Sequence, residues 1–464
     1  MFVIDGHVAP ELVSKQYLYY LNKLRSVTRI GERRNSRLPM MPTENLRIAF
    51  ATVEYVTEKY FDGGIANYLH RVTKALAALG HDVHVVTRSE IDEAEFEHDG
   101  VKVHRVMVNN GWHQLNRITR YRFATSIYLL GFSFRVYGQL RQLGSGNPFQ
   151  LVQFPNCRYC GLVSILFLGV PHVLRASSYQ TGWNDLRIER YLDFKAVEFL
   201  EKLQARRSPH IFAPSHTLKK TLESEAGLER VRVIHTPIYL ETTALDRSVC
   251  ERFADRKYLL YFGRFEMRKG FHILCQALEV FLAQNQDAIA VLVGRDMKTA
   301  LASSMAQYAR TLLSSYSDRI WLMDRLPHEQ LYPLIEGAHL VVLPSLMDNF
   351  PNACLEAMAL GRPIIGTRGA SFEEMLTDGE TGFLVSPNSP GELAEKILAA
   401  WVNPGLDAIG RAAREKAREF APERTVDALL AYYYEVLNGN PATRRSKRMG
   451  SLLGRVTQSF SMIR

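Results

Sequence analysis

The 464-residue chain contains no uncharged apolar run as long as the ~18 residues that indicate a membrane-spanning helix. Its best candidate, residues 159–174, is broken by Gly161, Gly169 and Pro171. The N-terminus, MFVIDGHVAP, lacks the basic start and apolar core of a signal peptide. The five cysteines are an odd number scattered over a long chain, which favours a reducing compartment over a disulfide scaffold. We therefore expect a cytoplasmic protein.

Acidic residues are missing from one long stretch, between Val101 and Asn184. That stretch carries nine basic residues: Lys102, Arg105, Arg117, Arg120, Arg122, Arg135, Arg141, Arg158 and Arg175. Residues 441–464 are also basic and free of acids, and residues 1–45 have a surplus of positive charge. The whole chain is only +9, so its remainder is negative. Such patches indicate an anionic partner, which is a membrane surface, a nucleic acid or an anionic substrate.

The spacing of apolar residues predicts an α/β fold in two halves. A buried strand at 46–53, a helical repeat at 65–79 and a second strand at 83–87 open the first half. The pattern restarts with a strand at 258–262 and a helix at 271–282. Further strands are predicted at 289–294, 339–344 and 363–367, and a further helix at 352–360. Both halves are typical of doubly wound sheets, and two such domains would face each other across a cleft.

These patterns divide the chain into five segments, with a domain boundary where the chain passes Pro237. The predicted segments are a basic amphipathic extension (1–45), an N-terminal Rossmann-like domain (46–235), a C-terminal Rossmann-like domain (236–424), a last helix packing back towards the first domain (425–440) and a basic tail (441–464).

The loop after the strand at 258–262 reads GRFEMRKG and spans residues 263–270. It places Arg264 and Lys269 five residues apart, between a strand and a helix. Arg can grip a phosphate with two hydrogen bonds and Lys adds a compact charge, so the two suit one anion above the strand ends. A solvated basic turn is the alternative interpretation.

A second loop, DNFPNACLE at 348–356, leads into the helix that starts at Asn352. Free backbone N–H groups at that start can bind phosphate oxygens. Asp348 and Glu356 can both face the cleft, where carboxylates accept hydrogen bonds from sugar hydroxyls. The alternatives are a helix-dipole partner for Asp348 and an exposed helical acid for Glu356.

Two adjacent glycines, Gly63 and Gly64, follow Asp62 ahead of the first long helix. They would let the backbone approach a phosphate or a sugar closely at a helix N-terminus. An ordinary tight loop is the alternative.

These motifs together resemble the family 4 retaining glycosyltransferases of the GT-B fold. The resemblance runs from about Leu46 to Leu437. It rests on RIAFATVEY, DGGIANYLHRVTKALAALGHDVHVVTR, GRFEMRKG and PSLMDNFPNACLEAMALGRPIIGTRGASFEEMLTDGETGFLV. The last segment is similar to the E-x7-E signature of the family. The resemblance implies two facing Rossmann-like domains, with the acceptor on the N-terminal one and a nucleotide diphosphate sugar on the C-terminal one.

The resemblance also implies how the donor's diphosphate is bound. Arg264 and Lys269 would bind it and act in catalysis, the backbone around Asn352 and Ala353 would assist, and Gly64 would lie near the phosphates from the N-terminal side. Members of the family are typically metal-independent, and no Asp-x-Asp suited to a nucleotide-bound metal is present. We therefore expect neither a metal nor a cofactor.

The remaining implied contacts are to the rest of the donor. Glu356 would hold the ribose, Asp348 would contact the donor sugar as a third catalytic group, and Arg325 would line the base pocket. Asp348 stands where the family usually has Glu, which would affect sugar choice. Ser177 stands where many members have a His, so no histidine base is carried over. The departing phosphate would take the acceptor's proton, while cations and helix amides stabilise it.

Residues 116–143 combine arginines with aromatic and aliphatic residues. A basic amphipathic helix there could lie on anionic lipid, and the basic tail repeats this composition. A helix with one buried face and a cationic outer face is the alternative. No motif of nucleic-acid recognition is present, so nucleic acid is not expected as a partner.

Cysteines and histidines offer no second site. Cys157 and Cys160 form a C-x-x-C without a matching ligand pair, so buried thiols are expected, as at Cys354. Three histidines near the domain boundary are expected to be structural or solvated: His210, His216 and His235.

We therefore predict a metal-independent retaining glycosyltransferase, peripheral to the cytoplasmic membrane face. It would serve a lipid-linked or polysaccharide acceptor in the synthesis of cell-surface glycans. The alternatives are a catalytically silent nucleotide-sugar-binding protein and a sugar-nucleotide epimerase on the same fold.

Overall fold

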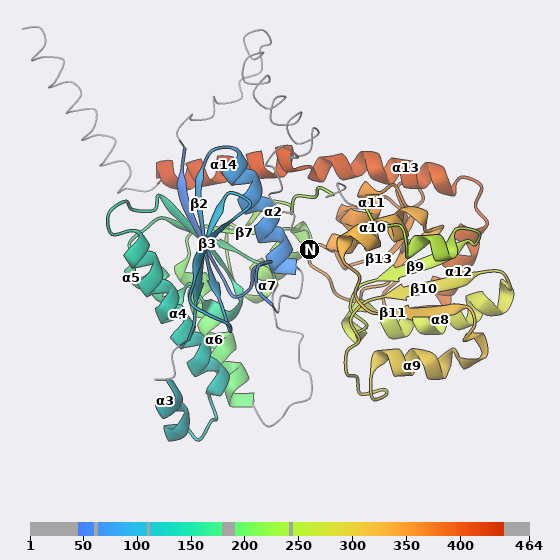
Figure 1. The fold of residues 1–464 in the computed structure, drawn as a ribbon, viewed down its shortest axis with the longest axis horizontal. Helices are drawn as coiled ribbons and strands as arrows, with labels where there is room; N and C mark the ends of the chain where they lie inside the picture. The colour runs from blue at the N-terminus through green and yellow to red at the C-terminus, as the bar shows by residue number, and fades with distance from the viewer. Residues whose placement is uncertain (1–44, 60–63, 109–111, 179–190, 241–244, 440–464) are drawn as a thin grey trace, which may run out of the picture.

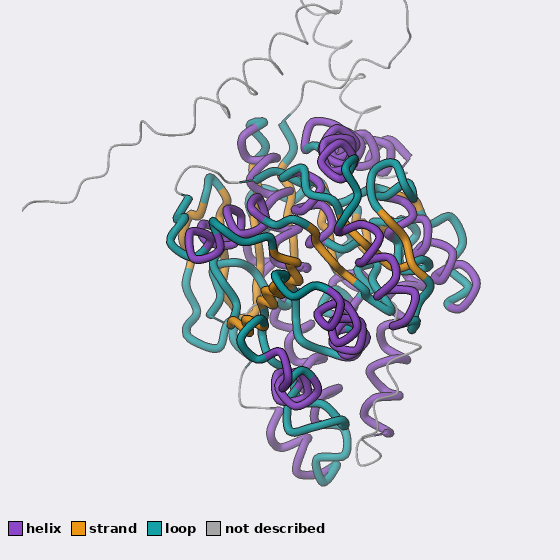
Figure 2. Tube along the Cα trace, turned by 90° about the vertical axis from the view of Figure 1, so that its right-hand side faces the viewer, coloured by secondary structure: helices purple, strands orange, loops and turns teal. Residues whose placement is uncertain are grey.

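The computed structural model describes residues 45–59, 64–108, 112–178, 191–240 and 245–439. Apart from Asn45, the predicted extension 1–45 lies outside these residues, as do the tail 441–464, Asp62 and Gly63. Figure 1 shows two α/β halves side by side, and Figure 2 shows the strands enclosed by helices.

The N-terminal half is built on an eight-stranded sheet in the order β3-β4-β2-β1-β5-β6-β7-β8. Its strands are β1 (Arg47–Thr52), β2 (Asp82–Arg88), β3 (Glu95–His98), β4 (Val101–Val106), β5 (Leu151–Pro155), β6 (His172–Arg175), β7 (Ile211–Ala213) and β8 (Arg232–Val233). All neighbours pair in parallel except β3 and β4, which pair antiparallel. Parallel strands of this kind are buried on both faces, which is why they read as continuous apolar runs.

Helices cover both faces of this sheet. They are α2 (Gly64–Ala78), α4 (Ala124–Leu143), α5 (Leu162–Phe167), α6 (Tyr191–Arg207) and α7 (His216–Glu225), whereas α3 (Trp112–Ile118) packs on α4. The last described helix, α14 (Pro422–Gly439), follows the C-terminal half in sequence but packs on the first sheet beside α2. In Figure 1 it runs back over the N-terminal half. The opposite face of the sheet packs against α4.

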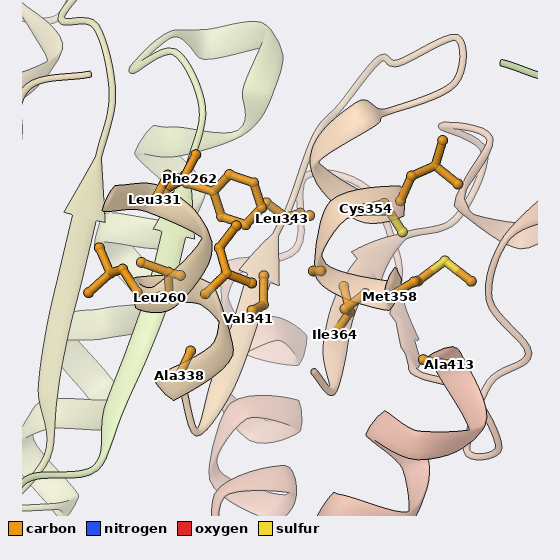
Figure 3. Packing of buried hydrophobic residues seen from close by; sticks show 14 of the residues in the cluster. Leu260, Phe262, Leu331, Ala338, Val341, Leu343, Cys354, Met358, Ile364 and Ala413 are labelled. Atoms are coloured by element: carbon orange, nitrogen blue, oxygen red, sulfur yellow. The ribbon is translucent and has the colours of Figure 1, made fainter. Parts of the chain in front are cut away.

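The C-terminal half is an all-parallel six-stranded sheet in the order β11-β10-β9-β12-β13-β14. Its strands are β9 (Tyr258–Phe262), β10 (Ile289–Val293), β11 (Ile320–Met323), β12 (Leu340–Leu343), β13 (Ile364–Thr367) and β14 (Phe383–Val385). Its helices are α8 (Phe271–Gln284), α9 (Met305–Leu312), α10 (His328–Gly337), α11 (Asn352–Ala359), α12 (Pro390–Trp401) and α13 (Leu406–Ala417). Figure 3 shows Leu260 and Val341 of the strands in the same buried apolar cluster as Met358 of α11, with Ile364 next to Met358.

The two Rossmann-like sheets confirm the predicted fold class, and most predicted strands lie within a residue or two of the observed ones. The prediction of one helix over residues 116–143 is wrong. Helix α3 ends at Ile118 and α4 begins at Ala124, because Arg120 and Tyr121 take left-handed φ values of 49° and 58°. One face of α4 is buried in the core, as the alternative interpretation of this stretch held.

Gly270 brings the GRFEMRKG loop against the loop that follows β12. Its φ is +66°, and a Cβ there would lie 1.8 Å from the carbonyl oxygen of Pro344. Only glycine fits both the left-handed backbone and this close approach. As a result Lys269 lies beside the loop that carries Asp348.

Candidate functional site

A cleft of about 920 Å³ lies between the two halves. It is bordered by residues at or just beyond the carboxyl ends of strands from both sheets, where open α/β folds bind their ligands. All predicted site residues line it: Gly64, Arg264, Lys269, Arg325, Asp348, Asn352, Ala353 and Glu356. Residues nearly 300 positions apart in sequence therefore meet in one cavity.

The cations of the GRFEMRKG loop are already paired with acids. Lys269 Nζ forms an ion pair with Asp348 Oδ2. Arg264 Nη2 lies 3.1 Å from Glu266 Oε1, and Arg268 Nη2 lies 2.8 Å from the same oxygen. All of these side chains except Glu266 line the cleft. An incoming anion could therefore take over cations that are already held in place by carboxylates.

The N-terminus of α11 opens into the same cleft. The residue before it is Pro351, and no side chain in the described part of the chain caps this end of the helix. Asn352 and Ala353 both line the cleft. Their N–H groups belong to the first turn, which has no intrahelical acceptors, so this end can bind an anion.

Glu356 is buried, and the alternative of an exposed helical acid is wrong. It is 5% exposed, and Arg71 Nη2 of α2 donates to its Oε1 at 3.1 Å. Arg71 is also 5% exposed. The pair joins the two halves across the cleft, since α2 packs on the N-terminal sheet and α11 packs on the C-terminal sheet.

Arg71 was missed by sequence reasoning. As a cation among the apolar positions of a helix, it would ordinarily lie on a solvated face. One signal could have found it: Arg71 follows Gly64 by seven residues, so it lies two turns along the helix face that starts at the glycine. The cleft lies along that face.

Gly64 is the first residue of α2, and a Cβ built on it would meet no atom within 4 Å. The described protein therefore leaves open space beside this backbone. Arg325 follows β11 and is exposed on the cleft wall, where its N–H donates to Asp324 Oδ1 at 2.7 Å.

Ser177 lies at the meeting point of the two halves. Its N–H donates to Asn156 Oδ1 at 2.9 Å, and its carbonyl accepts from Asn349 Nδ2 at 2.8 Å. Asn349 is the neighbour of Asp348 in the second half. The position without a histidine therefore adjoins the predicted sugar-binding carboxylate.

Glu374 makes a further contact between the halves that sequence reasoning missed. Its carboxylate accepts from the N–H groups of His216 and Thr217, both at 2.8 Å, and from the Thr217 hydroxyl at 2.9 Å. These donors lie in the first turn of α7, where unpaired N–H groups and the helix dipole both favour a negative charge.

Among the described residues, the one group of three potential metal ligands includes neither a cysteine nor any of the three histidines near the domain boundary. Cys157 and Cys160 are buried free thiols, and burial raises the pKa of Cys157 to about 11. A possible metal-ligand group comprises His70, His98 and Asp99. Lys74 Nζ already lies 3.0 Å from Asp99 Oδ2, where it would repel a cation.

Two family descriptions match the chain. "Glycosyltransferase Family 4" matches residues 62–242, and "Glycosyl transferases group 1" matches residues 256–403. Between them they cover most of both halves, including every predicted site residue.

Similar proteins carry related names. D-inositol 3-phosphate glycosyltransferase of Mycolicibacterium smegmatis is 29% identical over 241 residues, which are 49% of this chain and 54% of that protein. The chain thus matches only about half the length of this relative. Glycogen synthase of Mycobacterium tuberculosis is 23% identical over 394 residues, 80% of this chain and 91% of that protein.

Solved structures share the architecture. Sucrose-phosphate synthase from Thermosynechococcus elongatus has a TM-score of 0.67 at 22% identity, covering 85% of this chain and 99% of its own. HepE from Anabaena, solved with UDP and glucose, has a TM-score of 0.62 at 17% identity, covering 85% of this chain and 100% of its own. At these identities the likeness shows the GT-B fold.

The Glu374 contact predicts a measurable effect on the separation of the halves. Glu374→Ala removes three hydrogen bonds to a charged acceptor, each worth roughly 1.5–3 kcal/mol. We expect small-angle X-ray scattering to give a larger radius of gyration for this variant than for the wild type. Glu395→Ala, on an exposed position of α12, is the matched control. Superimposable scattering curves for Glu374→Ala and the control would show that Glu374 does not hold the halves together.

Proposed function

Because the chain belongs to glycosyltransferase family 4, we propose that it transfers a sugar from a nucleotide diphosphate sugar to an acceptor hydroxyl. One observation carries the proposal: Arg264, Lys269, the open start of α11 and Glu356 line a single cleft between two Rossmann-like sheets. Diphosphate, ribose and sugar are the groups that this combination of cations, amides and carboxylates would recognise.

Charge exchange accounts for how the donor would be held. The diphosphate replaces Glu266 and Asp348 as the partner of Arg264 and Lys269. Asp348 is thereby released beside the sugar, where its oxygens accept hydrogen bonds from hydroxyls. Glu356 accepts hydrogen bonds from the ribose hydroxyls, and Arg325 lies on the part of the cleft wall that binds the base.

Arg264 and Lys269 neutralise the charge of the diphosphate without a metal ion, so we expect that EDTA does not reduce turnover.

The transfer itself proceeds with retention of anomeric configuration. The bond from the anomeric carbon to the β-phosphate oxygen breaks, and a bond to the acceptor oxygen forms on the same face. Ser177 stands where many family members have a histidine, so no histidine base is available there. The acceptor's proton therefore passes to the departing phosphate. Arg264, Lys269 and the α11 amides stabilise the negative charge that develops on the leaving group.

Substituting Arg264 tests this mechanism. Arg264→Ala should lower kcat/KM about 10²–10³-fold, because a charge-stabilising donor is lost from the leaving group. Uridine diphosphate sugars are the first donors to assay, with a membrane extract as acceptor, and NMR of the product reads the anomeric configuration. Arg256→Ala, at an exposed position on the same half, should turn over normally.

Near-normal turnover of Arg264→Ala would remove the main support for the mechanism. Binding of donor by the wild type without transfer or hydrolysis would instead favour the silent nucleotide-sugar-binding protein.

We further propose that the enzyme meets its lipid-linked or polysaccharide acceptor at the inner membrane face, through the tip formed by residues 115–122. No described helix is long and apolar enough to cross a bilayer. The tip exposes three apolar and three basic side chains: Leu115, Ile118, Tyr121, Arg117, Arg120 and Arg122. Ile118 is 80% exposed, and Figure 1 shows α3 at the end of the N-terminal half.

Vesicle flotation tests the tip. Each basic residue near an anionic leaflet contributes ~1 kcal/mol, so replacing the three tip arginines by Gln should abolish binding to phosphatidylglycerol vesicles at low salt. Arg252, Arg310 and Arg411, all exposed on the C-terminal half, give a control variant of equal net charge when changed to Gln. If both variants float equally with the vesicles, the tip is not the membrane contact. If the wild type does not bind the vesicles at low salt, the proposal of membrane contact is wrong.

A further inference from the structure

Arg175 is a buried cation beside the predicted reaction centre. It is the last residue of β6 and precedes Ser177 by two positions. It is 7% exposed and lines the cleft on the N-terminal wall. The proposed mechanism gives it no role.

The surroundings of Arg175 are polar but uncharged. Its guanidinium carbon lies 3.6 Å from the ring centroid of Tyr68, and Nη2 donates to Thr236 Oγ1 at 3.3 Å. Its Nε is buried and has no hydrogen-bond acceptor among the residues that the structure describes. Among the described residues no carboxylate forms an ion pair with it, whereas Arg71 on the same wall pairs with Glu356.

Neighbouring ionisable groups do not supply a negative charge either. Tyr68, Tyr433 and Cys157 all interact with Arg175, and burial raises the pKa of each one. All three are therefore neutral at physiological pH. Tyr433 Oη donates a hydrogen bond to Gln153 Oε1 at 2.6 Å, so neither of these two side chains brings a negative charge to Arg175.

An uncompensated guanidinium is costly in such a place. Arg remains protonated in proteins, and a buried charge without a partner is strongly unfavourable. An apolar side chain of similar volume could pack on Tyr68 equally well, without the free-energy cost of burying a charge. The charge is therefore best explained by a ligand that brings its own anion.

We propose that Arg175 binds an anionic group, phosphoryl or carboxylate, of the acceptor. The proposal rests on the proposed function and narrows its acceptors to charged ones. The acceptor is favoured over the donor because Arg175 extends from the N-terminal sheet. The opposite wall has its own cations for the donor, Arg264 and Lys269.

Arg175→Met separates a ligand role from a packing role. Because the change removes an unpaired buried charge, we expect the variant to melt at or above the wild-type temperature. Binding is followed by thermal shift with saturating UDP, which fills the donor site, while inorganic phosphate or glucuronate is titrated. The wild type should be stabilised saturably by at least one anion, and the apparent Kd should rise at least tenfold in Arg175→Met.

The two anions distinguish the source of the charge, since a phosphoryl acceptor favours phosphate and a uronate acceptor favours glucuronate. Arg141→Gln, at an exposed position of α4, should bind both like the wild type. Arg175→Gln is the second variant should Arg175→Met fail to fold, with the same expected loss.

Three results would overturn the proposal. These are unchanged anion affinity in the variants, no anion effect on the wild type, and a tenfold loss of UDP affinity, which would assign Arg175 to the donor. Absence of any shift by UDP in the wild type would instead count against the proposed function, so the two failures are distinguishable.

Discussion

The buried ion pair between Arg71 and Glu356 is the contact on which the cleft depends. Each charge alone would be buried without compensation, and removing one partner of such a pair typically costs about 3–5 kcal/mol. The pair forms only when α2 and α11 face each other, so it favours the arrangement of the halves that the structure shows. Asn349 with Ser177, and Glu374 with the start of α7, add hydrogen bonds across the same junction.

The arrangement of the halves matters because the proposed chemistry needs a dry and charged cavity. In the described structure the cations proposed to bind the donor are paired with acids of the chain itself, which hold them in place without a ligand. A diphosphate that replaces those acids meets a site that is already organised, so little reorganisation remains for the reaction itself. Exclusion of water between the halves would also protect the donor from hydrolysis.

Local patterns in the sequence predicted both sheets and eight residues that line the cleft. GRFEMRKG and the start of α11 were found because a loop between a strand and a helix has a defined position at the sheet edge. Arg71, Arg175 and Glu374 were not found, since the residues that they contact are remote in sequence and, for Arg175, include no carboxylate among the described residues. The break between α3 and α4 was missed because Arg120 and Tyr121 take left-handed backbones without a glycine to signal the turn.

A double-mutant cycle on Arg71 and Glu356 tests most directly whether this pair assembles the donor site. UDP affinity would be measured by calorimetry for Arg71→Met, Glu356→Gln and the double variant. We expect each single change to weaken binding, and the double change to cost less than the sum by more than about 1 kcal/mol. Losses that add within roughly 0.3–0.5 kcal/mol would show that the two residues act independently and would contradict the central role of the pair.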